Sequence, residues 1–288
     1  MMTQRTWGVS VMTAAAALMF VAAPAASAHR MEKRFAVGER PVITISNHHG
    51  RIEVKSWKKP EVVVVGNHNS NKVEVDTEQA GNRIEVNTHL LSENIVPADL
   101  EANYEITVPE ESELHVKTDS GEITIERVFG DMTFDTVAAD VQLQEVAGAM
   151  VVKTIGGSVL CVRCAGRIDV RSISGSVRFV QPQMDNVRVE TTSGNILFDG
   201  EFLRRGIYIL KNGNGLIEVR FADTDSFDLS ATTVNGTIEN QARIKPDVHG
   251  RHSPSARFKT SLFGTVNEGH AKVELSSFSG TIRILKRD

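Results

Sequence analysis

Two cysteines three residues apart are the first candidates for chemistry in this chain. Cys161 and Cys164 have the spacing of a redox pair or of half a zinc site. A structural zinc ion takes four ligands, and the sequence contains only these two cysteines. We therefore expect no zinc site, and we expect both side chains to face inward as buried thiols. A disulfide between them stays open as the alternative in an oxidising compartment.

Three of the nine histidines lie in segments with the composition of turns. His48 and His49 belong to the stretch NHHG, and His68 belongs to GNHNSN, so all three are close to asparagine or glycine. Acidic residues do not accompany them at the spacing of a catalytic metal site. We therefore predict no metal site and no cofactor.

Catalysis on a polysaccharide would require paired carboxylates. Glu122 and Asp140 are the best pair, because they occupy the same position in successive copies of a sequence repeat. Ser158 and Ser176 continue that position without charge. We therefore predict no catalytic residues and no enzymatic activity, and a carbohydrate-active enzyme of the polysaccharide lyase or glycosidase kind is the rival interpretation.

Five arginines from neighbouring copies of the repeat could form a basic patch for an anionic glycan or a lipid head group. They are Arg163, Arg167, Arg171, Arg178 and Arg188. Asp169 and Glu190 interrupt the series, so a solvated and partly ion-paired surface is the alternative. The formal net charge of −4 disfavours a nucleic-acid partner. We predict glycans or envelope components as partners, with these arginines as the candidate binding patch.

All these residues must be positioned by a repeat that runs through most of the chain. Each copy has a central small residue, with apolar residues seven and five positions before it and two and four positions after it. The central copies are centred on Gly121, Ala139, Gly157, Gly175, Gly194, Gly215 and Gly236, and outlying copies are centred on Gly50 and Gly280. Successive central copies are 18 to 21 residues apart, which is the signature of a repeat architecture.

The apolar alternation predicts two short strands per copy, each with one buried face. The central glycine marks the corner between them, because glycine adopts positive φ without a steric penalty. Gly130, Gly148 and Gly166 mark the opposite corner. We therefore predict an all-β chain, a β-solenoid or β-helix-like stack of rungs of about 18–21 residues with irregular β caps. The handedness, a two-sided or three-sided cross-section and the oligomeric state stay open.

Two polar positions precede each centre. Four residues before it, charged side chains such as Lys117, Asp135, Lys153 and Arg171 predict ion pairs between successive copies. Three residues before it lies a hydroxyl or amide side chain, in Thr118, Thr136, Thr154, Ser172, Thr191, Asn212 and Thr233. We place this second series on the outer surface too, where it can cap backbone groups of the corner and bond along the stack.

The chain divides into four parts. Residues 1–28 have an arginine, an apolar stretch and the small residues Ala26, Ser27 and Ala28, which predict a signal peptide cleaved after Ala28. Residues 29–110 form an N-terminal β segment or cap, 111–240 the regular rungs, and 241–288 an irregular loop and a C-terminal capping rung. The rest of the chain contains no apolar stretch long enough to span a bilayer, so we predict an exported protein, periplasmic or extracellular and associated with the cell envelope.

Several stretches resemble a known family. KTDSGEITIE, RSISGSVRFV, ETTSGNILFDG and NEGHAKVELSSFSGTIRIL are similar to the bacterial putative-adhesin family, a group of exported proteins of unknown function with repeated β-strands. The similarity runs from about Val42 to Leu285. The resemblance implies an adhesive or scaffold role and brings no catalytic residues. We predict a non-enzymatic, adhesin-like or envelope scaffold protein that presents a rigid β surface, and an accessory protein of envelope stress sensing is a further alternative.

Overall fold

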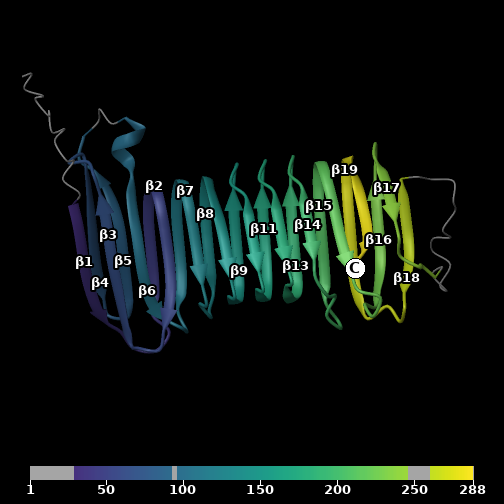
Figure 1. Ribbon diagram of the computed structural model, residues 1–288, viewed down its shortest axis with the longest axis horizontal. Helices are drawn as coiled ribbons and strands as arrows, with labels where there is room; N and C mark the ends of the chain where they lie inside the picture. The colour runs from purple at the N-terminus through teal and green to yellow at the C-terminus, as the bar shows by residue number, and fades with distance from the viewer. Residues whose placement is uncertain (1–28, 93–95, 246–259, 288) are drawn as a thin grey trace, which may run out of the picture.

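The computed structural model describes residues 29–92, 96–245 and 260–287. The predicted signal peptide, residues 1–28, and residues 246–259 of the predicted irregular loop lie outside the described residues. Within them the chain is almost entirely strand, with one short 3-10 helix, η1 (Pro97–Leu100). The strands are stacked side by side into an elongated rack (Figure 1). The all-β, solenoid-like class predicted from the sequence is confirmed.

The strands pair in two layers that enclose one apolar core, and the long strands bend so that their two halves lie in different layers. The first layer contains, in spatial order, β4 (Val73–Ala80), β5 (Arg83–Leu90), β2 (Val42–Trp57), β7 (Glu113–Glu126), β8 (Met132–Gln144), β9 (Ala147–Thr154), β11 (Ala165–Ser172), β13 (Gln183–Thr191), β15 (Ile207–Phe221), β19 (Ala271–Lys286), β16 (Phe227–Thr233) and β18 (Ser261–Val266).

The second layer begins with β1 (His29–Ala36), β3 (Glu61–His68) and β6 (Ala102–Pro109). It continues through the second halves of β2, β7 and β8 to β10 (Val159–Val162), β12 (Val177–Val180), β14 (Ile196–Asp199), the second halves of β15 and β19, and β17 (Thr237–Asn240). The cross-section, which the sequence left open, is therefore two-sided.

Equivalent apolar residues of successive copies lie next to one another in the core. Val159 pairs with Val141 on one side and with Val177 on the other, in parallel strands, and all three side chains are at most 1% exposed. The opposite layer repeats this arrangement, where Ile168 pairs with Met150 and Val187. Each buried aliphatic side chain contributes about 1.5–3 kcal/mol, so stabilisation is spread along the whole stack.

The outlying copy at Gly280 does not cap the chain, contrary to our expectation for residues 241–288. β19 lies between β15 and the pair β16 and β17, with Gly280 in register with Gly215 (Figure 1). The physical reason is the apolar pattern, which is complete in β19, whereas Asn240 takes the last apolar position of the Gly236 copy. The incomplete copy therefore lies near the end of the rack, where β18 pairs with β16 in antiparallel orientation.

The outlying copy at Gly50 is also inside the rack. β2 pairs with β7 along one edge, and on its other edge it pairs first with β5 and then with β6. The strands beyond these, β4, β3 and β1, are antiparallel to their neighbours. The N-terminal segment thus adds antiparallel strands to the end of a parallel stack.

Close approach of successive copies, rather than positive φ, explains most of the central glycines. A Cβ atom on Gly157 would lie 1.8 Å from the carbonyl oxygen of Ala139, and one on Gly175 would lie 1.9 Å from that of Gly157. Positive φ occurs at Gly121 and Gly215 but not at Gly157 or Gly175, so our conformational explanation is wrong for the latter two. We call this edge of the rack the glycine corner.

The hydroxyl and amide series points inward, not outward as we expected. Thr118 and Ser172, for example, are 1% and 7% exposed. The reason is strand alternation, since positions seven, five and three before the centre share one face. Their capping role is present: the backbone N–H of Gly157 donates to Thr154 Oγ1 (3.0 Å), and that of Gly175 donates to Ser172 Oγ (2.8 Å).

Candidate functional site

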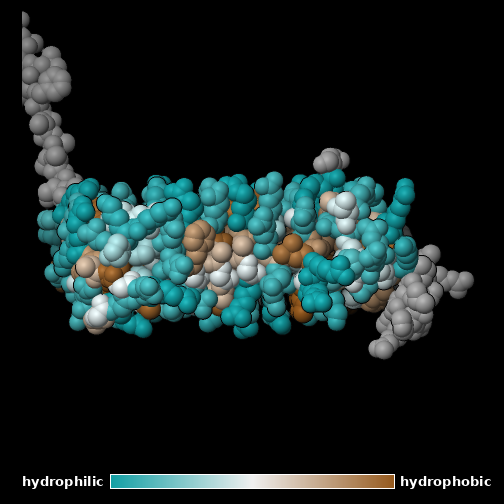
Figure 2. All heavy atoms as spheres, turned by 90° about the horizontal axis from the view of Figure 1, so that it is seen from below, coloured by the Kyte–Doolittle hydropathy of each residue, from teal (hydrophilic) through white to brown (hydrophobic). Residues whose placement is uncertain are grey.

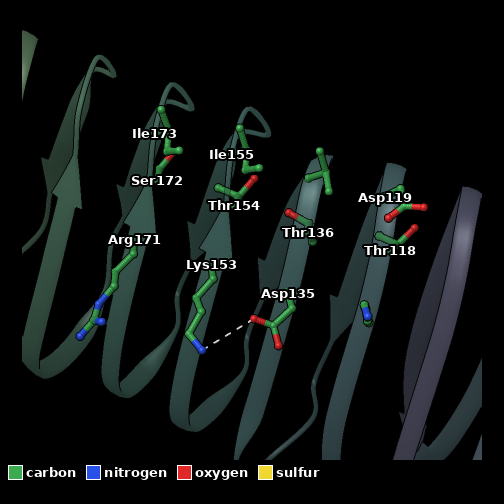
Figure 3. A pocket seen from close by; sticks show the side chains of 12 residues that line it. Thr118, Asp119, Asp135, Thr136, Lys153, Thr154, Ile155, Arg171, Ser172 and Ile173 are labelled. Carbon is green, nitrogen blue, oxygen red and sulfur yellow. Dashed lines mark ion pairs between the residues drawn. The ribbon is translucent and has the colours of Figure 1, made fainter.

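A shallow groove of about 400 Å³ runs beside the glycine corner, across β7, β8, β9 and β11. The same three positions of four successive copies line it, namely those four, three and two residues before each centre. These lining residues are Lys117, Thr118, Asp119, Asp135, Thr136, Val137, Lys153, Thr154, Ile155, Arg171, Ser172 and Ile173. We call it the corner groove (Figure 3).

Charged side chains form one side of the corner groove. Lys117, Asp135, Lys153 and Arg171 are successive neighbours in register, so opposite charges meet along most of the column. The Nζ atom of Lys153 lies 3.8 Å from Oδ1 of Asp135, and Figure 3 shows this pair beside Arg171 on the next strand. Such exposed pairs contribute about 0–1 kcal/mol each, so these charges remain available to a partner.

Aliphatic side chains form the other side of the corner groove, at the turns. Val137, Ile155 and Ile173 are 45%, 50% and 51% exposed, and they occupy one position in three successive copies. Figure 3 shows Ile155 and Ile173 beside the turns that end β9 and β11. Contiguous exposed apolar side chains on a folded protein commonly mark a contact surface. We call these three residues the aliphatic column.

We did not predict the aliphatic column from the sequence, because we assigned no role to the two positions before each central residue. The signal was present: aligning the copies on their centres puts valine, isoleucine and isoleucine where turn residues are expected. Thr192 and Gly213 occupy this position in the next two copies. Beyond them, Phe278 and Val234 continue it as exposed residues, 59% and 60% exposed.

The backbone beneath the aliphatic column is tied from one copy to the next. Ile155 N–H donates to the carbonyl oxygen of Val137 at 3.2 Å, and Ile173 N–H donates to that of Thr154 at 3.3 Å. Ser174 N–H donates to the carbonyl oxygen of Ile155 at 2.8 Å. The turns are therefore held by the same pairing that builds the stack, which fixes the spacing of the exposed side chains.

The structure brings only part of the predicted arginine patch together. Arg167 and Arg171 lie on β11 and Arg188 on the adjacent β13, so these three share the first layer. Arg178 lies on β12 in the second layer, and Arg163 lies in the connection between β10 and β11. The five side chains thus belong to two faces and an edge.

Three of these arginines have acidic partners. Arg163 Nε lies 3.1 Å from Glu145 Oε1, Arg171 Nε lies 3.4 Å from Asp169 Oδ1, and Arg188 Nη2 lies 2.8 Å from Glu190 Oε1. The hydrogen bond and the charge of Glu190 raise the pKa of the Arg188 guanidinium. The arrangement corresponds to the partly ion-paired surface that we kept as the alternative.

Comparison with known protein families identifies the family to which this chain belongs. The family model of Toastrack DUF4097 matches residues 42–285. This chain belongs to the Toastrack DUF4097 family. The match agrees with the resemblance to putative adhesins that the repeated sequence suggests. A comparison of the Toastrack chain with curated proteins finds no significant match.

Two solved structures illustrate what this Toastrack chain is similar to. A putative adhesin from Bacteroides fragilis is 13% identical with a TM-score of 0.48, and the match covers 90% of this chain and 99% of that one. A putative adhesin from Parabacteroides distasonis is 9% identical with a TM-score of 0.41, covering 89% of this chain and 97% of that one. With TM-scores below 0.5, neither likeness bears on the function of the Toastrack chain.

The two cysteines of the Toastrack chain form a disulfide, so our expectation of buried thiols is wrong. Cys161 and Cys164 are bonded, with their Cα atoms 5.9 Å apart, and both are fully buried as expected. The physical reason lies in the corner between β10 and β11, where Arg163 has a φ of 51°. This turn brings the two Cα atoms within disulfide range.

The three histidines considered for metal binding lie in two places. His48 and His49 extend the line of the glycine corner, where His48 Nδ1 lies 2.9 Å from Asp119 Oδ2 and His49 Nδ1 lies 2.9 Å from Ser120 Oγ. His68 lies at the end of β3, where its ring is stacked on that of His29. In the part of the chain that the structure describes, no three histidine, cysteine, aspartate or glutamate side chains gather to hold a metal ion.

Glu122 and Asp140, the best carboxylate pair for a hydrolase or lyase, are adjacent on β7 and β8. Each has partners within the Toastrack stack. Glu122 Oε1 accepts a hydrogen bond from Gln142 Nε2 at 2.8 Å, and its Oε2 lies 3.4 Å from Arg51 Nε. Asp140 Oδ1 accepts one from the backbone N–H of Ser158 at 2.8 Å. These contacts give both acids a role in joining neighbouring copies.

Proposed function

We propose that this protein is an exported, non-enzymatic, adhesin-like binding protein that holds a partner of the cell envelope along its corner groove. Its body is a rigid solenoid of rungs of about 18–21 residues. The observation that carries the proposal is the aliphatic column: three large apolar side chains, about half exposed, stand in line at successive turns. Exposed apolar side chains fixed in a row favour contact with another molecule.

Pre-organisation supports binding at this place. The turns that carry Ile155 and Ile173 are hydrogen-bonded to the copies beside them, so little conformational freedom remains to be lost on binding. Equivalent positions on neighbouring strands are about 4.8 Å apart, which gives the groove a regular spacing along the rack. A partner with apolar groups at a similar spacing can contact every member of the column.

The lining favours an amphipathic polypeptide helix over a glycan. Apolar side chains on one face of an α-helix recur about every turn, at a rise of about 5.4 Å, close to the spacing of the aliphatic column. Acidic and basic residues flanking that face can meet Lys117, Asp135, Lys153 and Arg171. Envelope glycans, which we expected from the arginine patch, then become the competing outcome of the test.

Export is the second part of the proposal. The signal-like pattern of residues 1–28 and the small residues before His29 support cleavage after Ala28. The disulfide between Cys161 and Cys164 suits an oxidising compartment such as the periplasm or the cell exterior. Among the described residues there is no helix with the length and apolar character to cross a membrane.

Binding assays with defined ligands test the proposal. We would present the protein without residues 1–28 to synthetic amphipathic helical peptides, with leucines at positions i, i+4 and i+7, and in parallel to a glycan array. We expect peptide binding that weakens at least about tenfold in an Ile155→Glu, Ile173→Glu double variant. Ile207→Glu, which changes a 42% exposed isoleucine outside the groove, is the matched control and should bind normally.

Two results would overturn this assignment. If the protein bound glycans and none of the peptides, the partner class would be wrong. If the Ile155→Glu, Ile173→Glu double variant bound the peptides as tightly as the unmodified protein does, the corner groove would not be the binding site. All three substituted isoleucines are exposed, so we expect each variant to keep the fold. Circular dichroism of each variant checks that the stack is intact.

A further inference from the structure

We propose that removal of the signal peptide creates a copper(II)-binding site at the N-terminal end of the rack. Its donors are the free α-amine of His29, the imidazole of His29 and the imidazole of His68. This inference rests on the part of the proposed function that concerns export, because the amine exists only after cleavage behind Ala28. It does not depend on the corner groove, which lies on other strands.

The two histidines are held opposite each other by strand pairing. β1 and β3 are antiparallel, and His29 is the direct partner of His68 in their register. The ring centroids are 5.1 Å apart and the ring planes differ by 17°. Directly opposed residues have Cβ atoms about 4.5–5.5 Å apart, so rotation of the exposed His29 side chain can bring both imidazoles to one ion, at a metal–nitrogen distance of about 2 Å.

A backbone contact selects the nitrogen of His68 that can bind a metal. Nδ1 of His68 lies 2.8 Å from the carbonyl oxygen of Ser70. A carbonyl oxygen only accepts hydrogen bonds, so Nδ1 carries the proton and Nε2 keeps its lone pair. Metal-ligating histidines typically donate their second ring nitrogen to a carbonyl or carboxylate, which orients the ring and fixes its tautomer. His68 has this arrangement already.

His29 supplies two donors once it is the first residue. Its α-amine nitrogen and its Nδ1 can bind the same ion, and the chelate ring that they close has six members. Before cleavage the same backbone nitrogen belongs to a peptide bond and has no available lone pair. The described side chains alone provide no three-residue metal cluster, so the new amine is the donor that completes the set.

Three nitrogen donors favour copper(II) over other divalent ions. Copper(II) prefers tetragonal coordination by nitrogen and oxygen, and it binds such donors more tightly than the other first-row divalent metals. Water can complete the coordination, since His29 is exposed.

The decisive experiment compares two forms of the protein that differ only in the position of the amine. One form begins at His29, and the other has eight glycine and serine residues before it, which move the amine away from the imidazole. Copper(II) is titrated into each form against a competing chelator. We expect one tightly bound copper ion in the first form and at least about 100-fold weaker binding in the second.

Substitution of His68 tests the second imidazole. His68→Ala in the form that begins at His29 should weaken copper binding at least about tenfold and remove one nitrogen from the coupling pattern in electron paramagnetic resonance. His270→Ala, at the other end of the rack, is the matched control and should change neither readout. Circular dichroism of both variants checks that the strands are intact.

The outcomes separate this site from the proposed function. Equal copper affinity in the two N-terminal forms would overturn the copper site, and His29 and His68 would then be only a stacked pair of rings on neighbouring strands. The proposal for the corner groove would not be affected by that result. N-terminal sequencing of the exported protein would overturn both the site and the proposed cleavage if it showed a first residue other than His29.

Discussion

Replacing Gly157 by alanine tests how closely successive copies approach. The added Cβ would lie 1.8 Å from the carbonyl oxygen of Ala139 and 2.5 Å from its carbonyl carbon. Gly156, the preceding residue, provides a matched control, because a Cβ there would meet nothing nearer than Ser174 Oγ at 3.7 Å. Neither glycine has the positive φ that would itself penalise alanine. The two variants therefore differ in steric contact alone.

The magnitudes follow from packing and chain entropy. Forcing a methyl group into a closely packed site costs about 1–3 kcal/mol, and the contact at Gly157 is with backbone that cannot move without separating two strands. Alanine at Gly156 restricts the unfolded chain and stabilises the fold by about 0.4–1 kcal/mol. We expect the free energies of unfolding of the two variants to differ by roughly 1.4–4 kcal/mol.

Urea unfolding followed by circular dichroism at the β-sheet minimum measures this difference. The Gly157→Ala midpoint should fall well below that of the unmodified protein, and the Gly156→Ala midpoint should equal or exceed it. A Gly157→Ala variant as stable as the Gly156→Ala variant would refute the contact between the two copies. The corner groove would then lose the spacing on which our binding proposal depends.

Three further predictions concern the core, the disulfide and the tyrosines. Val177→Asp buries an unpaired carboxylate beside Val159 and should abolish cooperative unfolding. Arg178→Glu, on the exposed side of the same strand, should change the free energy of unfolding by no more than about 0.5 kcal/mol. Replacing both Cys161 and Cys164 by alanine should lower the free energy of unfolding by about 2 kcal/mol, because the unfolded chain regains the entropy that the closed four-residue loop removes. A reductant should destabilise the unmodified protein and leave the alanine variant unchanged. Burial raises the pKa values of Tyr104 and Tyr208, the only tyrosines of the chain, to about 12, so absorbance at 295 nm should show tyrosine ionisation near pH 12 in the folded protein. Because the folded pKa lies above the unfolded value of 10.0, stability should fall as pH rises from 10 toward 12, and titration of the folded protein near pH 10 would contradict the burial.

The repeat frame made the core predictable. Apolar residues at fixed distances from each centre had to share a face, and Val141, Val159 and Val177 are neighbours in the core. The same frame also contained information that we did not use. Arg178 follows its glycine by three residues and Arg171 precedes it by four, so the corner between them already separates the two side chains. Extending the alternation by one more position would have turned Thr118 and its equivalents inward.

Other features depend on contacts that periodicity does not encode. The order of strands at the C-terminal end depends on which copy packs better on β15. The complete apolar pattern of β19 places it there, although β16 and β17 are nearer to β15 in the sequence. The disulfide depends on a tight turn at Arg163 that brings two fully buried sulfur atoms together. The pair of His29 and His68 depends on an antiparallel register between segments that carry no repeat.

Methyl nuclear Overhauser effects between valine and isoleucine side chains test the stacking of copies most directly. We predict effects within the core between Val141 and Val159 and between Val159 and Val177, since these pairs are direct neighbours on parallel strands. The same spectrum should show a second series along the surface, from Val137 to Ile155 and from Ile155 to Ile173. Absence of the core series would contradict the stacked architecture. Absence of the surface series alone would contradict only the alignment of the aliphatic column.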